Sequence, residues 1–117
     1  MADDVVMVST PFVPEHRVVR TVGMVWGIVV RSRGFGPNLV AGLRSLAGGE
    51  IKEYTSMLTA ARGHALDRMR DEARARGANA VLEVRFDSSA IGQTMSEIVA
   101  YGTAVVIAPG DPMMMAD

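Results

Sequence analysis

The feature that most constrains this chain is one long amphipathic segment, residues 53–77, which reads EYTSMLTAARGHALDRMRDEARARG. No other segment is long and periodic enough to cover a sheet. At about 100° per residue its apolar members share a narrow arc: Tyr54, Leu58, Ala61, Ala65 and Met69. Asp67, Arg70 and Asp71 fall on the opposite side. We therefore expect a helix that docks on a sheet through its apolar stripe.

Three segments have the composition and alternation of β-strands. Residues 17–30 are rich in β-branched side chains, and both of their alternating faces are apolar. Glycines within that strand allow a helix or another backbone to approach closely. Residues 78–87 and 94–107 predict two further strands, joined by a turn at 88–93. The last strand is again apolar on both faces, so each face needs a covering partner.

A short helix is predicted over residues 38–47, where apolar positions recur at helical spacing and Gly48 and Gly49 follow. The order of elements is then strand, short helix, long helix, strand, strand (β-α-α-β-β). This order predicts an α+β fold of two layers. In it, a three-stranded antiparallel sheet is covered by one long and one short helix.

The chain divides into three regions by pattern. Residues 1–16 form an N-terminal arm, because Pro11 and Pro14 interrupt any continuous strand ladder there. Residues 17–108 form a single α+β domain. Residues 109–117 have no periodicity, and we expect a disordered tail.

Composition excludes several classes of function. The 117 residues are 49% hydrophobic, which is apolar for a small monomer and suggests that something covers part of the surface. A net charge of −1 gives no reason to expect nucleic acid or an anionic membrane as a partner. The absence of cysteine excludes disulfides and thiolate ligands. The N-terminus lacks the features of a signal peptide, so we expect a cytoplasmic location.

Metal ligation has three candidate residues. His64 and Asp67 lie three positions apart on the long helix, and His16 lies in the arm. A transition-metal site needs several converging imidazoles, carboxylates or thiolates. Arg68 would repel a cation held by His64. We favour structural or solvent-exposed roles for these residues and expect neither a metal site nor a cofactor.

The loop RSRGFGPN is the best candidate for binding an anion, because glycines before a helix leave backbone amides free and arginines add charge. Its candidate residues are Arg31, Arg33, Gly34, Gly36 and Asn38. The spacing matches neither a P-loop nor a dinucleotide fingerprint. A plain turn with solvated arginines explains the segment equally well and is the favoured interpretation.

No catalytic arrangement is evident. The arginines of the long helix alternate with acids and lack a stacking aromatic residue, which is typical of a solvated face rather than a nucleic-acid surface: Arg68, Arg70, Arg74 and Arg76. No GxSxG elbow occurs. In the last hairpin, if Phe86 lies opposite Ser96, Arg85 faces Glu97 and forms a cross-strand ion pair. We therefore expect no enzymatic activity.

The block ARxxAxxxMxxxAxxxGANAV beginning at Ala61, together with GTAV at Gly102, resembles the YbjQ-like family. These are small bacterial proteins labelled as heavy-metal-binding domains, and the resemblance covers roughly residues 9–107. It implies a dodecin-subunit-like α+β fold and homopentameric rings. It implies no established activity.

The favoured function is a non-enzymatic homo-oligomeric ring that acts as a scaffold or binder. Two strands are apolar on both faces, and one helical layer covers only one side of the sheet, so copies of the chain should cover the other. The number five comes only from the family resemblance. The alternative is a module that binds a small molecule, an anion or a heavy-metal ion. No nucleic acid or membrane is expected as a partner.

Overall fold

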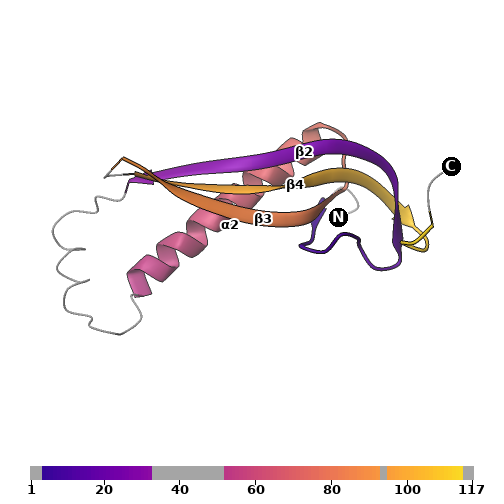
Figure 1. Ribbon diagram of the computed structural model, residues 1–117, viewed down its shortest axis with the longest axis horizontal. Coiled ribbons are helices and arrows are strands. Elements are labelled where there is room, and N and C mark those ends of the chain that lie inside the picture. Colours follow the sequence, from indigo (N-terminus) through magenta and orange to yellow (C-terminus); the bar gives the residue numbers. More distant parts are fainter. Residues whose placement is uncertain (1–3, 33–51, 93–94, 115–117) are drawn as a thin grey trace.

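The computed structural model describes residues 4–32, 52–92 and 95–114. These form five elements (Figure 1): β1 (Val6–Met7), β2 (His16–Ser32), α2 (Lys52–Ala75), β3 (Ala80–Ile91) and β4 (Met95–Pro109). The strands make one sheet in the order β1-β3-β4-β2, in which β1 runs parallel to β3 and the other pairs are antiparallel. Helix α2 packs on one face, mainly against β2 and β4. None of the described helical residues form a span long and apolar enough to cross a membrane.

Helix α2 ends in a Schellman motif built on Gly77. Gly77 has a φ of 86°, a left-handed conformation that costs glycine little. Its N–H donates to the carbonyl of Arg74 at 3.0 Å, and the N–H of Ala78 donates to that of Ala73 at 3.0 Å. The chain therefore leaves the helix sharply and enters β3 within a few residues.

The predicted apolar arc of the helix is confirmed over its middle. Four residues at four-residue spacing are buried: Ala61, Ala65, Met69 and Ala73. They pack on buried side chains of the central strands, among them Val25, Val29, Ala100 and Ala104. Leu58, one turn earlier, stays half exposed. Small side chains on both layers let the helix lie close to the sheet, and Gly27 makes the closest approach: a Cβ there would lie 2.6 Å from the backbone nitrogen of Met69.

A second, smaller core lies at the end of the sheet where β1 is found. It contains Leu82, Val105 and Ile107, with Val8 and Val13 of the arm packed against it. The arm therefore covers part of the sheet near one end, and the helix covers the middle of the other face.

The expected three-stranded antiparallel sheet with two helices is wrong. The sheet has four strands and is mixed, because Val6 and Met7 pair in parallel with Ala80 and Val81. Backbone bonds continue this contact to Thr10, whose carbonyl accepts the N–H of Glu83 at 3.0 Å, and end before Pro11. The described residues contain a single helix. The short helix expected over 38–47 lies outside them.

The predicted hairpin register is also wrong. Strand β3 continues to Ile91, so the turn is shorter than expected, and Arg85 pairs with Tyr101 while Glu97 pairs with Ser89. Arg85 donates instead to the carbonyl of Ser9 at 2.8 Å. A bulge at Glu83, with φ of 53°, interrupts the simple alternation expected along this strand.

The close contact at Gly27 generates a prediction with a matched control. Gly27→Ala should lower the free energy of unfolding by about 1–3 kcal/mol, because its Cβ meets helix backbone that cannot move without moving the helix. Gly63→Ala should raise it by about 0.5–1 kcal/mol, because that helical glycine has open space around it. Urea denaturation measures both. The same change in the free energy of unfolding for Gly27→Ala and Gly63→Ala would contradict the close docking of the helix at Gly27.

Candidate functional site

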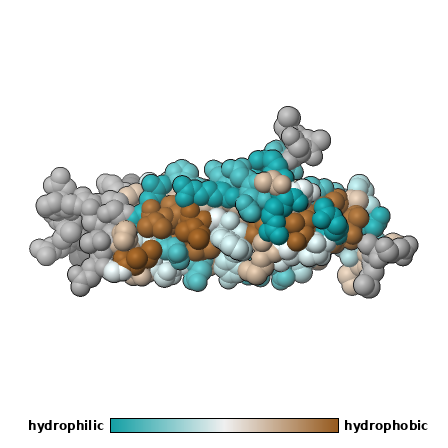
Figure 2. All heavy atoms as spheres, turned by 90° about the horizontal axis from the view of Figure 1, so that it is seen from above, coloured by the Kyte–Doolittle hydropathy of each residue, from teal (hydrophilic) through white to brown (hydrophobic). Residues whose placement is uncertain are grey.

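The most unusual surface of this chain is a row of large apolar side chains on β2 that face away from the helix. We call it the open-face strip: Met24, Trp26, Ile28 and Val30, which are 61%, 53%, 38% and 50% exposed. The residues between them, Val25 and Val29, are buried under the helix. The prediction that both faces of this strand are apolar is confirmed. In the view of Figure 2, exposed hydrophobic residues form several patches along the molecule.

The strip continues onto the neighbouring strand. Across the ladder, Trp26 pairs with Tyr101 and Ile28 pairs with Val99, and both partners are partly exposed. Directly opposite residues on antiparallel strands share a face. The arm packs against the smaller core through Val8 and Val13 and against the helix-side core through Val5 and Met7. An apolar surface two strands wide is therefore left exposed by the described part of the chain.

The predicted anion site is only partly within the described residues. Arg33, Gly34, Gly36 and Asn38 lie outside them. Arg31 is described, and its guanidinium donates to Nδ1 of His64 at 2.7 Å. Arg31 thus joins the end of β2 to the helix instead of standing free in solvent.

The three metal candidates do not come together. His64 receives a hydrogen bond from Arg31, so its Nδ1 lone pair is engaged by a cation. Asp67 accepts a hydrogen bond from Arg70 at 2.8 Å. His16 contacts the carbonyl of Pro14 through Nδ1 at 2.9 Å, at the opposite end of the 17-residue strand β2. In the described ranges no three His, Cys, Asp or Glu side chains are placed to hold a metal ion.

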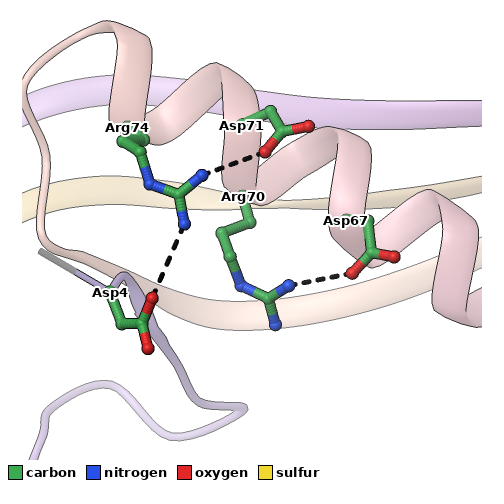
Figure 3. A network of polar contacts seen from close by, with 5 residues as sticks. All are labelled: Asp4, Asp67, Arg70, Asp71 and Arg74. Carbon is green, nitrogen blue, oxygen red and sulfur yellow. Dashed lines mark hydrogen bonds and ion pairs between the residues drawn. The ribbon is translucent and has the colours of Figure 1, made fainter. Parts of the chain in front are cut away.

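The helical arginines, which were predicted to form one solvated face, divide into two groups. Figure 3 shows the first group, in which Arg70 pairs with Asp67, and Arg74 pairs with Asp71 at 3.1 Å and with Asp4 of the arm at 3.8 Å. These are exposed pairs and are worth little to stability. They also confirm that this side of the helix faces solvent.

The second group consists of Arg68 and Arg76, and their contacts with the sheet were not predicted from the sequence. Arg68 donates to the carbonyl of Ile28 at 2.5 Å, and Arg76 donates to the carbonyl of Met24 at 2.8 Å. Both arginines reach from the helix to backbone atoms of β2. Their spacing of eight residues places them on one flank of the helix, and this is the signal that sequence reasoning could have used.

One further hollow, of about 320 Å³, lies between the first half of α2 and the β3–β4 hairpin. Leu58, Arg62, Ser88 and Ile98 are among its lining residues. Among the described residues that line it, Arg62 is the only ionisable one, and its guanidinium lies 5.6 Å from the ring centre of Phe86. A single arginine bound to an aromatic face offers no acid and base pair, so this hollow supports no catalytic assignment.

Comparison with known proteins places these features in a family context. A UPF0145 protein of Thermoplasma acidophilum is 64% identical over 104 residues, covering 89% of this chain and 87% of the relative. A UPF0145 protein of a Bradyrhizobium species is 58% identical over 109 residues, covering 93% and 98%. These relatives come from both archaea and bacteria, a wider range than the bacterial one expected.

A crystal structure of a protein of unknown function from Pediococcus pentosaceus, assigned to the DUF74 family, superimposes with a TM-score of 0.63 at 7% identity. It covers 89% of this chain and 98% of that one, which shows a shared fold. The family model described as "Putative heavy-metal-binding" matches residues 5–108. The chain therefore belongs to the YbjQ family of UPF0145 proteins, as its GANAV and GTAV blocks indicated.

Proposed function

We propose that this chain is the subunit of a non-enzymatic homo-oligomeric ring whose copies associate through the open-face strip. The observation that carries the proposal is the exposure of four large apolar side chains in a row on β2. Monomeric soluble proteins rarely expose contiguous apolar patches beyond a few hundred Å². Each Å² removed from water contributes roughly 25 cal/mol, so covering this strip would favour association.

We propose that a second copy of this chain covers the open-face strip. The net charge of −1 produces little repulsion between copies. Subunit number does not follow from this surface. A pentamer is the expectation that the family resemblance supplies, and a cytoplasmic location likewise stays a prediction.

Disrupting the strip should disrupt assembly. Ile28→Glu places a charge among apolar side chains and is expected to shift the protein from oligomer to monomer in light scattering coupled to size exclusion. Val19→Glu is the matched control, because Val19 lies on the same strand, is 43% exposed and lies outside the strip. Trp26 is the only tryptophan, so its emission should move to shorter wavelength on assembly.

A wild-type monomer of 12.5 kDa at micromolar concentration would overturn the proposed assembly. A trimer or hexamer would leave it standing and discard only the pentamer. Dissociation of both glutamate variants would show that added charge, and not loss of the strip, breaks the assembly.

The family description raises metal binding as a second function, and the donor set in the described residues does not fit it. Structural and catalytic zinc sites use three or four converging nitrogen, sulfur or oxygen ligands. His64 and Asp67 are each bonded to a different arginine, and His16 lies at the far end of β2. A cation approaching His64 would meet the charge of Arg31 at 2.7 Å from the ring nitrogen.

We therefore expect Zn²⁺, Ni²⁺ and Cu²⁺ to bind no more tightly than they bind isolated surface histidines. Isothermal titration calorimetry of each ion against wild type and His64→Ala measures this directly. His16→Ala is the control for a histidine outside the helix. Submicromolar affinity that only His64→Ala abolishes would contradict the expectation and indicate ligands shared between subunits.

A further inference from the structure

The outer edge of β2 lies next to no other strand in the described sheet, although β2 is its longest member. An unpaired apolar edge is a template on which a strand of another molecule can add. Natural proteins protect such edges with charged side chains or by covering them. Without protection, the edge of β2 would therefore promote aggregation by strand addition, especially in a protein that also exposes an apolar face.

Ladder geometry identifies which backbone groups point outward. The carbonyl of Val105 accepts the N–H of Asn79, so Val105 bonds toward β3. Backbone groups alternate along a strand, so Gly102 and the other even-numbered residues of β4 bond toward β2. Their partners are odd-numbered residues of β2, such as Val25. The even-numbered residues from 24 to 30 consequently turn their N–H and C=O groups to the open edge.

Two of these outward carbonyls are occupied by the helix. Arg76 binds that of Met24 at 2.8 Å, and Arg68 binds that of Ile28 at 2.5 Å. Eight helical residues rise about 12 Å, and four strand residues span about 13 Å. The matched spacing lets one straight helix reach two carbonyls on the same edge.

The two arginines belong to a longer row on the flank of α2, which we call the edge row: His64, Arg68, Glu72 and Arg76. His64 contacts Arg31 near the end of β2. Glu72 and Arg76 line a hollow of about 250 Å³ together with Met24, Val25 and Trp26. The row places polar and charged groups along the strand edge between residues 24 and 31. An incoming strand would have to displace them before it could bond to β2.

We propose that Arg68 and Arg76 protect the edge of β2 against strand addition by a second copy of this chain. Each arginine satisfies an outward carbonyl and places a cation where a neighbouring backbone would lie. Association through the open-face strip remains possible, because that face is perpendicular to the protected edge. The inference rests on the proposed function only in naming that face as the permitted contact.

The test removes both arginines. Arg68→Ala with Arg76→Ala is expected to produce species larger than the wild-type assembly in light scattering and a rise in thioflavin T fluorescence. In hydrogen exchange, amides between residues 24 and 30 should become slower to exchange as concentration rises. The matched control is Arg70→Ala with Arg74→Ala, which removes the same charge from the same helix but breaks only pairs with acids. This control should have the size, the thioflavin T fluorescence and the amide exchange rates of the wild type.

Unchanged size and unchanged exchange in the Arg68 and Arg76 variant, with far-UV circular dichroism showing that it is folded, would overturn the proposal. If the double variant does not fold, the single variants decide, since each should slow exchange only beside the carbonyl that it exposes. Aggregation of the control pair to the same extent would also overturn it. A monomeric wild type whose double variant still associates would refute the proposed assembly and leave the edge protection standing.

Discussion

The close contact between α2 and the middle of β2 is the interaction on which the rest of this structure depends. It requires small groups on both layers, Ala61, Ala65 and Ala73 on the helix and Gly27 on the strand. A larger residue at Gly27 would push the helix away from the sheet. Close packing in turn lets dispersion forces act over many atoms, which offsets the small apolar area that alanine buries.

The same contact determines which surfaces remain for other partners. Because the helix covers one face of β2, the apolar side chains between its buried positions are left on the other face. Because the helix also runs along the strand, its flanking arginines reach the outer backbone of β2. The docking of the helix therefore leaves the outer face of β2 exposed, while helical arginines bind two carbonyls at its edge. The face is more accessible to a partner than the edge is.

The arm shows how non-local pairing shapes the sheet. Val6 pairs with Ala80, 74 positions later, and the arm also packs on the smaller core. Forming this contact closes a long loop of chain, which costs conformational entropy that only the assembled sheet can offset. Asp4 adds an exposed ion pair to Arg74 of the helix. The arm is thus part of the sheet and not a segment that only precedes it.

The long helix, its buried stripe and the two apolar faces of β2 could be predicted from the sequence, because they depend on periodicity and on local backbone preference. The GANAV and GTAV blocks of the sequence also indicated the YbjQ family. The partner of β1, the bulge at Glu83 and the register of the hairpin could not be predicted and became clear from the folded chain. These depend on contacts between distant segments and on where a turn closes, and a pattern of side chains along one strand does not specify its neighbour. The sequence places Arg68 and Arg70 on different sides of the helix. The tertiary structure was needed to show that the side of Arg68 lies over the backbone of β2, whereas Arg70 pairs with an acid at the surface.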